Sequence, residues 1–187
     1  MIQFSLPFPS KQLAHQELTY DPCYSKIPIK DRQPIVESAW EKGEQAALMT
    51  YEKYGGSYGF NEIAVKSGLT VKMKNADYIV GNQRYFSDYI SGRNLLILYL
   101  GSIQKWAESN SLDLPTAVNM IISHEYFHFL EWTSLGLTSR EYTVPMLTIG
   151  KLKLGKTGIR ALSEIGAHAF AHTYFHLAGC GDKEVME

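Results

Sequence analysis

Two histidines stand four residues apart in the stretch SHEYFHFLEW, residues 123–132, and a glutamate directly follows the first of them. On an α-helix, His124 and His128 lie about 40° apart on one face, so both imidazoles can point at one ion. Glu125 lies beside them on the same side. This is the HExxH arrangement, in which two histidines bind Zn²⁺ and the glutamate takes a proton from a metal-bound water. The pattern therefore predicts a zinc site with Glu125 as general base.

The neighbours of these residues are apolar and favour burial of the helix: Ile121, Ile122, Phe127, Phe129 and Leu130. An unpaired histidine or glutamate in such surroundings is costly, and coordination to a cation removes that cost. The alternative is a core helix whose two histidines are satisfied by hydrogen bonds alone. A second polar motif further along the chain favours the metal.

Zinc hydrolases normally use three protein ligands and leave one position for water. The metzincin pattern needs a glycine and a histidine after the second motif histidine. Glu131 and Ser134 occupy those positions, which excludes that class. Glu164, near the start of the segment ALSEIGAHAFAHTYFH, is our choice for the third ligand. His168, one helical turn later, could orient a ligand, stabilise an oxyanion or substitute as a ligand.

The roles of the other polar residues near the two motifs can be interpreted in more than one way. Glu131 shares the helix face of the two motif histidines and is either a partner of a ligand or a surface carboxylate. His172 and His176 continue the four-residue spacing of Glu164 and His168, a pattern that a solvated helix face also produces. The donor that would stabilise an oxyanion remains open, and the candidates are His168, His172, Tyr142 and Tyr174.

Helices and strands are expected to hold these residues in place. Helical spacing predicts helices at 34–54, 60–67, 102–109, 113–132 and 158–178. Alternating residues predict strands at 69–74, 78–80, 84–90 and 94–100, while 133–157 is expected to be a connection. The result is an α+β fold in which a small, mainly antiparallel sheet packs on the HExxH helix and a C-terminal helix. Residues 1–32 form an N-terminal arm and residues 33–187 a single domain.

The composition excludes several classes of protein. A net charge of −1 over 187 residues gives no reason to expect nucleic-acid binding. The run LLILYL at 95–100 is far shorter than a membrane span, and Pro7 and Pro9 interrupt the region where a signal peptide would lie. Cys23 and Cys180 are far apart and form no CxxC motif. We therefore expect a cytoplasmic protein with reduced thiols and no membrane association.

The motifs HEYFH and Glu164-Ile165-Gly166-Ala167-His168-Ala169-Phe170-Ala171, together with FNEIAVKSGLTVKM at 60–73, resemble the ImmA/IrrE-like zinc metallopeptidases of the gluzincin class. The resemblance covers roughly residues 34–175. It implies a zincin-like fold, zinc bound by His124, His128 and Glu164, and Glu125 as the general base. It also implies proteolysis of a helix-turn-helix repressor.

The leading hypothesis is a zinc endopeptidase that acts on a protein or peptide substrate. A first alternative is a non-catalytic, metallopeptidase-like module that regulates a partner by binding it, and a second is a metal site for a non-peptide hydrolysis. The strand at 95–100 is either a sheet edge that pairs with an extended substrate or a buried strand. The pattern carries no information on the oligomeric state.

Overall fold

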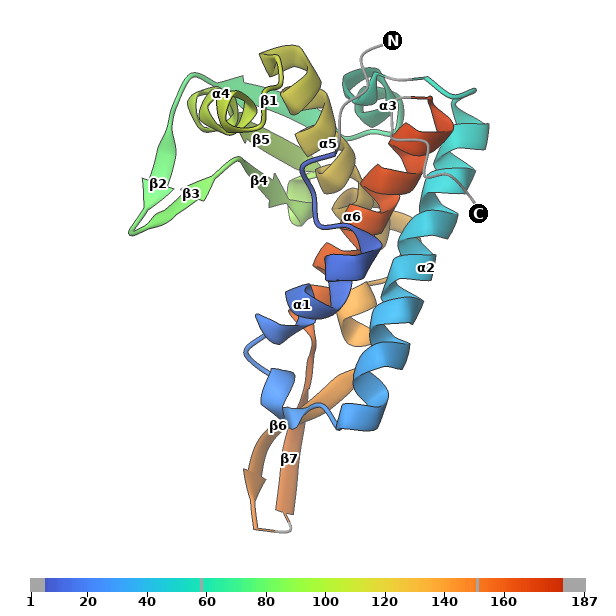
Figure 1. Cartoon of the computed structure of the whole chain (residues 1–187), viewed down its shortest axis with the longest axis vertical. Coiled ribbons are helices and arrows are strands. Elements are labelled where there is room, and N and C mark those ends of the chain that lie inside the picture. The colour runs from blue at the N-terminus through green and yellow to red at the C-terminus, as the bar shows by residue number, and fades with distance from the viewer. Residues whose placement is uncertain (1–5, 58, 151, 180–187) are drawn as a thin grey trace.

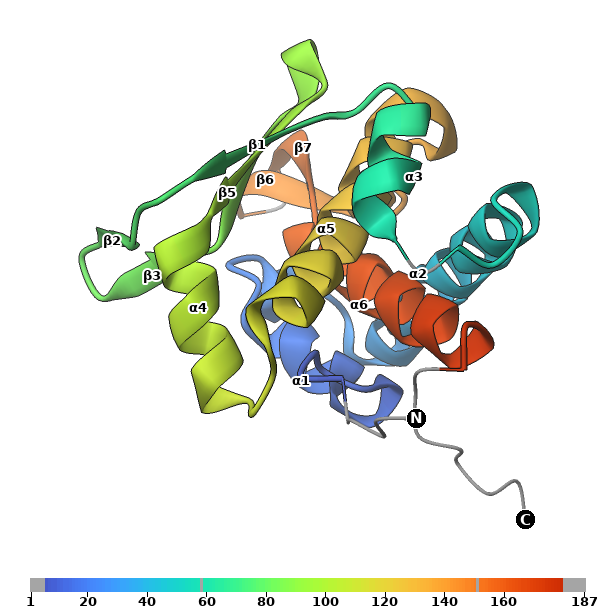
Figure 2. The same ribbon diagram turned by 90° about the horizontal axis from the view of Figure 1, so that it is seen from above.

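The computed structural model describes residues 6–57, 59–150 and 152–179. Six α-helices and small, mainly antiparallel sheets make up this part of the chain, which confirms the α+β class. α5 (Leu114–Leu130) lies between the main sheet and α6 (Arg160–Leu177), and α2 (Ile29–Lys53) packs on the other side of α6 (Figures 1 and 2). In the described ranges, the helices are all too short or too polar to cross a membrane.

The main sheet has three strands in the order β1-β5-β4, with β1 (Thr70–Lys74) parallel to β5 (Leu95–Tyr99) and β4 (Ser87–Ile90) antiparallel to it. β5 is therefore the central strand, and its Leu96 and Leu98 are fully buried. The prediction that this segment could be an open sheet edge is wrong, because strands flank it on both sides. The edge strand next to α5 is β4.

The remaining short elements fill the connections. β2 (Tyr78–Val80) and β3 (Gln83–Tyr85) form a hairpin beside the main sheet, and α4 (Leu100–Ser109) follows β5 directly. Short 3₁₀ turns lie at Lys11–Leu13, Tyr24–Lys26, Ser91–Arg93 and Thr138–Arg140. The strand predicted at 84–90 is interrupted at Phe86, whose carbonyl oxygen accepts a hydrogen bond from the amide of Tyr99 at 2.9 Å.

α5 forms where the sequence predicts it. The Asp113 side chain caps the helix by accepting a hydrogen bond from the amide of Thr116 at 2.8 Å, and a proline occupies the first turn. The helix is apolar on most sides, so that neighbours cover it nearly all round. It continues into one π-helical stretch, Glu131–Leu135.

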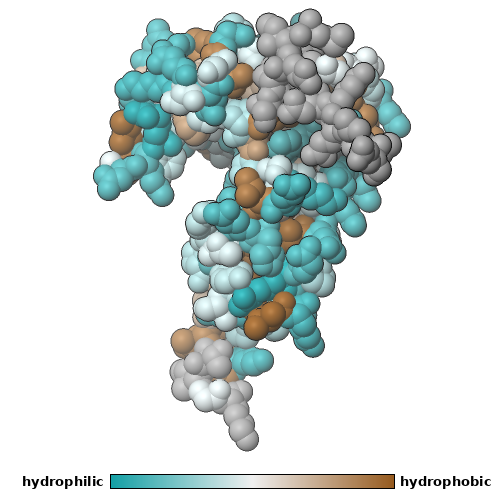
Figure 3. Space-filling view, viewed as in Figure 1, coloured by the Kyte–Doolittle hydropathy of each residue, from teal (hydrophilic) through white to brown (hydrophobic). Residues whose placement is uncertain are grey.

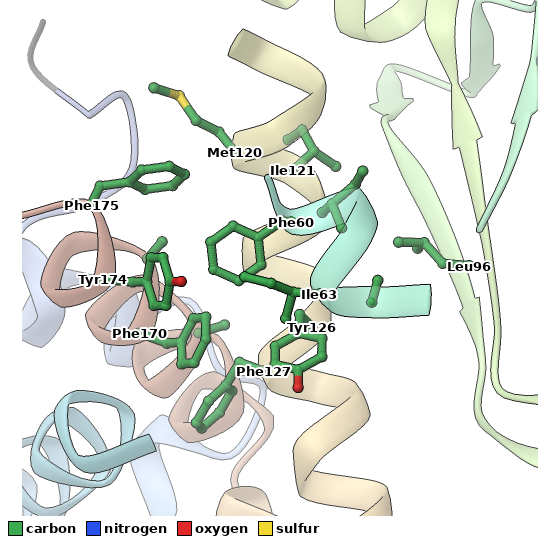
Figure 4. Packing of buried hydrophobic residues seen from close by; sticks show 14 of the residues in the cluster. Phe60, Ile63, Leu96, Met120, Ile121, Tyr126, Phe127, Phe170, Tyr174 and Phe175 are labelled. Atoms are coloured by element: carbon green, nitrogen blue, oxygen red, sulfur yellow. The ribbon is translucent and has the colours of Figure 1, made fainter. Parts of the chain in front are cut away.

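α5 and α6 meet through aromatic side chains. Phe60, the first residue of α3 (Phe60–Lys66), lies between the two helices, with its ring centroid 4.6 Å from that of Tyr174 (Figure 4). Gly166 on α6 faces Phe127 on α5 so closely that a Cβ on the glycine would lie 2.6 Å from the phenyl Cζ. The large Phe127 in the HExxH motif therefore fits against a residue that has no side chain, which brings the two helices into close contact.

The same stretch of α6 also contacts α2 closely. A Cβ on Gly43 of α2 would lie 2.2 Å from the carbonyl oxygen of Gly166, so only glycine allows this approach. Glycine inside a helix costs stability, and the place of Gly43 at the crossing explains why α2 contains one. α6 is thus held from two sides at a single position.

The segment before α2 contains regular structure. α1 (Ala14–Thr19) packs on α2 and α6, and the side chains of Ala14, Leu18 and Ile27 are buried. α2 begins at Ile29 rather than near Pro34, so the boundary expected between residues 32 and 33 falls inside this helix. α1 is only six residues long, too short for its periodicity to be recognised in the sequence.

The segment predicted as a connection between the last two helices forms a β-hairpin instead. β6 (Thr143–Ile149) and β7 (Leu152–Gly158) pair antiparallel and project from the rest of the molecule (Figure 1). The described residues of β7 are largely exposed, so burial does not impose the alternation by which strands are recognised. On the face seen in Figure 3, hydrophobic residues are scattered, and the surface is hollowed beneath the part that carries the sheet.

Candidate metal centre

α5 and α6 bring His124, His128 and Glu164 together at the point where the two helices meet. Each residue contributes one possible ligand atom, and these atoms all lie within 4.8 Å of one another. The two imidazoles come from successive turns of α5, and the carboxylate comes from the second turn of α6. This group could hold a metal ion.

The two histidine–carboxylate distances in the group are close to those between the ligand atoms of a tetrahedral site. His124 Nε2 lies 3.2 Å from Glu164 Oε2, and His128 Nε2 lies 3.5 Å from Glu164 Oε1. Ligand atoms about 2.0–2.1 Å from a tetrahedral zinc ion are themselves about 3.3 Å apart. The histidine side chains are 12% and 17% exposed, whereas that of Glu164 is 47% exposed, so solvent reaches the group from the carboxylate side.

Glu131 is a partner of a ligand and not a surface carboxylate, since it is only 3% exposed. Its Oε2 accepts a hydrogen bond from His128 Nδ1 at 3.0 Å. Its Oε1 accepts from the amide of Thr138 and from the hydroxyl of Ser163, both at 2.8 Å. This bond keeps a proton on Nδ1, so that loss of the other ring proton leaves the Nε2 lone pair of His128 for a metal, in the tautomer that binds one.

The charges of the centre shift the pKa values of its residues. Burial alone would lower the pKa of His128, but the hydrogen bond to Glu131 and the nearby carboxylates of Glu164 and Glu125 raise it to about 9. Burial would raise the pKa of Glu164, but the hydrogen bond with His124 and the charge of His128 lower it. Without a metal, the centre is thus held together by imidazolium and carboxylate charges of opposite sign.

Glu125 lies beside the ligand group and is fixed by the edge strand. Ser87 on β4 donates its hydroxyl hydrogen to Glu125 Oε1 at 2.7 Å. The charge of Glu125 is among the causes that raise the pKa of His128, as expected for neighbouring side chains. The second carboxylate oxygen of Glu125 is left for another proton donor.

His168 lies next to the centre but outside the ligand group. Its ring centroid is 5.0 Å from that of His124 and 5.7 Å from that of Phe8. The side chain is buried, and burial together with the nearby His124 lowers the pKa of His168 to about 3. The residue is therefore a neutral imidazole packed against a ligand.

The N-terminal segment covers one side of the centre. The ring of Phe8 lies 5.4 Å from that of His124 and stacks on Trp106 at 5.8 Å. The Phe8 carbonyl oxygen accepts a hydrogen bond from His172 Nε2 at 3.1 Å, so His172 anchors this cover. On α1, burial and the charge of Glu164 raise the pKa of Glu17, which places a further carboxylate near the site.

The two tyrosines proposed as oxyanion donors have other partners. The Tyr142 hydroxyl donates to Asp31 Oδ2 at 2.7 Å, and the Tyr174 hydroxyl donates to the carbonyl oxygen of Ser57 at 2.5 Å. His176 is exposed on α6, as a solvated helix face predicts. Cys180 lies outside the described residues, and Cys23 is a free thiol. Tyr142, Tyr174, His176 and Cys23, which the structure describes, do not belong to the ligand group.

A cavity of about 330 Å³ opens beside the centre. His128, Glu131 and Glu164 line it, together with Tyr89 of the edge strand and Arg160 at the start of α6. The Tyr89 hydroxyl is buried and has no hydrogen-bond partner among the described residues. A substrate near the metal ligands would therefore meet both an aromatic and a cationic side chain.

Sequence reasoning missed Ser87, Tyr89 and Phe8, and it considered Arg160 only as one basic residue of a segment that either contacts an acidic partner or is a solvated loop. The first two lie in the segment predicted as a strand, but nothing local shows that this strand is the edge beside the HExxH helix. Phe8 lies in a segment without periodicity. Arg160 offered a signal, because it precedes Glu164 by four residues and so lies one helical turn away on the same face.

Comparison with known proteins does not identify a relative of this chain. No family model, no curated protein and no solved structure matches this chain. The function therefore has to be argued from the site itself.

Proposed function

We propose that this chain is a zinc-dependent endopeptidase. The observation that carries the proposal is the convergence of His124, His128 and Glu164 from two helices, with Glu125 next to them on α5. Two imidazoles and one carboxylate are the ligand set of catalytic zinc sites that keep one position for solvent. Imidazole also suits other transition metals, so zinc is the first choice among several.

Bound zinc would supply a Lewis acid that polarises water and the carbonyl of the scissile peptide bond. Glu125 accepts a proton from the attacking water and passes it to the leaving amine. Ser87 donates a hydrogen bond to one oxygen of Glu125, and the other oxygen is the one that accepts the proton. Glu131 keeps His128 in the tautomer that binds the metal, and neutral His168 holds the His124 ring in place through packing.

The edge strand supports an extended peptide as substrate. Phe86 turns its carbonyl oxygen towards β5, and main-chain groups alternate in direction along an antiparallel strand. Ser87 and Tyr89 therefore point their main-chain N–H and C=O groups away from β5, where the described residues place no further strand. An extended substrate can pair with this edge, beside Glu125.

The resemblance to ImmA/IrrE-like metallopeptidases favours a protein substrate and, within that class, a helix-turn-helix repressor. It rests on HEYFH, on Glu164 with the residues that follow it, and on 60–73. In the structure, 60–73 forms α3, which packs on α5, followed by a glycine turn and the start of β1. The α+β arrangement is compatible with a zincin-like fold.

A second candidate is a non-catalytic module that binds a partner through the same scaffold. Phe8 favours it, because its ring lies against His124 and His168 and covers this side of the centre. A binding module has no need of the proton acceptor Glu125. Substitution of Glu125 therefore separates the two functions.

The test is metal analysis of the purified chain and of its Glu125→Gln variant, followed by incubation with a peptide library and with candidate repressors. We expect both proteins to bind one zinc ion per chain, since Glu125 is not a ligand. Hydrolysis should fall about 10²–10⁴-fold in the variant, the usual contribution of a general base.

The matched control is Glu108→Gln, which removes an exposed carboxylate on α4 that accepts a hydrogen bond from Gln104 and should leave hydrolysis unchanged. Equal cleavage by the wild-type chain and the Glu125→Gln variant would show that Glu125 is not the base. Zinc binding without any cleavage, but with retention of a partner by both proteins, would favour the binding module.

A further inference from the structure

The cavity beside the candidate metal ligands contains an arginine that has no partner among the described residues. Arg160 is exposed at the wall of the cavity, and its side chain makes no hydrogen bond or ion pair in the described part of the chain. It is the first residue of α6, one turn before the ligand Glu164. A substrate group in the cavity would therefore lie between the metal position and a guanidinium.

The two acidic residues of the cavity wall are already engaged. Both oxygens of Glu131 accept hydrogen bonds, one from His128 and the other from Thr138 and Ser163. Both oxygens of Glu164 face the imidazoles of His124 and His128. Neither carboxylate pairs with Arg160, and a bound divalent cation would offset their charge. Arg160 is thus a cationic side chain in the cavity wall that can pair with an incoming anion.

The remaining walls suit a short side chain. Trp132, which is 57% exposed, and Leu137 line the cavity and provide apolar surface. The Tyr89 hydroxyl, which has no partner among the described residues, can donate a second hydrogen bond after a small rotation. A volume of about 330 Å³ holds one amino-acid side chain, not a folded segment.

We infer that this cavity is a specificity pocket for a carboxylate of the substrate, held by Arg160 next to the scissile bond. The inference rests on the proposed peptidase function, from which it takes its class of substrate. Two sources supply the same chemistry: the side chain of an aspartate or glutamate, and the free carboxyl end of a chain. Guanidinium pairs with either in the same two-pronged geometry.

The experiment measures binding and not cleavage. The zinc-loaded Glu125→Gln chain is titrated with four alanine-based peptides whose N-termini are acetylated. Binding is measured by calorimetry and by tryptophan fluorescence, to which Trp132 in the cavity contributes. One pair differs only in a central glutamate or glutamine. The other pair differs only in a C-terminal carboxylate or amide. Each peptide is also tested on chains that carry Arg160→Gln, Arg160→Lys or the control Arg140→Gln.

We expect one acidic peptide to bind about tenfold more tightly than its neutral partner, the usual effect of one charge-assisted hydrogen-bonded pair. Which pair shows the preference identifies the source of the carboxylate. Arg160→Gln should abolish the preference and Arg160→Lys should keep part of it. Arg140→Gln should leave it unchanged, because this exposed residue follows Ser139 of the cavity wall but does not line the cavity itself.

Equal binding of acidic and neutral peptides, no binding of any peptide, or a preference that survives Arg160→Gln would overturn the inference. These outcomes are separate from a failure of the proposed function. A carboxylate preference without hydrolysis by the wild-type chain would leave the pocket in place and reject the peptidase. Hydrolysis by the wild-type chain without any preference for acidic peptides would support the peptidase and reject the carboxylate pocket.

Discussion

At the scale of single residues, Glu131 shows how a neighbour controls a metal ligand. Glutamine at this position has one acceptor oxygen and one NH₂ group, whereas Glu131 accepts hydrogen bonds at both oxygens. If the NH₂ group of the glutamine faces His128, it donates to Nδ1 and favours the tautomer with a proton on Nε2, which cannot bind a metal through Nε2. If it faces Thr138, it meets the amide N–H of that residue, which is also a donor. We expect Glu131→Gln to lower zinc affinity about 10–100-fold, measured by competition with a coloured chelator.

The control for this measurement is again Glu108→Gln, which changes the same charge on an exposed face of α4. A zinc affinity of Glu131→Gln within twofold of that of the wild-type chain would mean that His128 is oriented by packing alone. The sequence allowed Glu131 to be either a surface carboxylate or a partner of a ligand. The choice depends on Thr138 and Ser163, which approach only after the chain folds.

His128 also predicts a pH dependence of metal binding. Its pKa is raised from the usual 6.5 to about 9, so the imidazole of the metal-free protein is protonated at neutral pH. A metal binds the neutral ring, so binding at pH 7.5 should release about one proton, and affinity should rise with pH up to about 9. Calorimetry in buffers of different ionisation enthalpy counts that proton. Release of none at pH 7.5 would contradict the raised pKa.

At the scale of elements, the contact of Gly166 with Phe127 sets the distance between α5 and α6. A methyl group at Gly166 would lie 2.6 Å from Phe127 Cζ, so the helices have to separate or the ring has to move. We expect Gly166→Ala to destabilise the protein by about 1–3 kcal/mol and to weaken zinc binding, measured by denaturant unfolding and chelator competition.

Two further variants make this result specific. Phe127→Leu combined with Gly166→Ala removes the bulk that the new methyl group meets, and should restore part of the zinc affinity. Gly92→Ala is the matched control, because a Cβ there would meet no atom within 4 Å. Equal losses in Gly166→Ala and Gly92→Ala would show that the close approach is not what limits the site.

The elements also show which parts of the molecule sequence patterns could predict. The HExxH helix with its Asp113 cap and the last helix were predictable, because capping and helical periodicity are local. The grouping of Glu164 with the two histidines could also be predicted from the sequence, since it depends on residue type and spacing. The β6–β7 hairpin was not, since its exposed faces lack an apolar pattern. The place of β4 at the sheet edge depends on long-range pairing, which no local pattern encodes.

At the scale of the whole molecule, two hydrophobic clusters share α6. One cluster joins α6 to α5, α3 and the sheet through residues such as Phe170 and Tyr174. The other joins it to α1 and α2 through Leu162 and Ile165. Glu164 of the candidate ligand group is next to Ile165 of the second cluster, whereas Phe127, beside His128, belongs to the first, so both clusters have to form before the group is complete.

We therefore expect a single cooperative unfolding transition, seen alike by circular dichroism and tryptophan fluorescence. Leu18→Ala, in the cluster around α1, should lower the stability of the whole protein by about 2–5 kcal/mol, because Leu18 is fully buried. The exposed Leu13→Ala serves as its control. Two separate transitions, with only one of them sensitive to Leu18→Ala, would show that the clusters unfold independently.

The side-by-side position of α2 and α6 has a consequence for synthesis on the ribosome. On the order of a hundred residues separate the two helices in the chain, so α2 emerges long before the helix that covers it. Until then the apolar face of α2 stays open to chaperones, and the two histidines of α5 lack the neighbouring carboxylate of Glu164. The candidate ligand group is thus complete only once translation has passed α6, and we expect a nascent chain stalled before that point to hold zinc poorly.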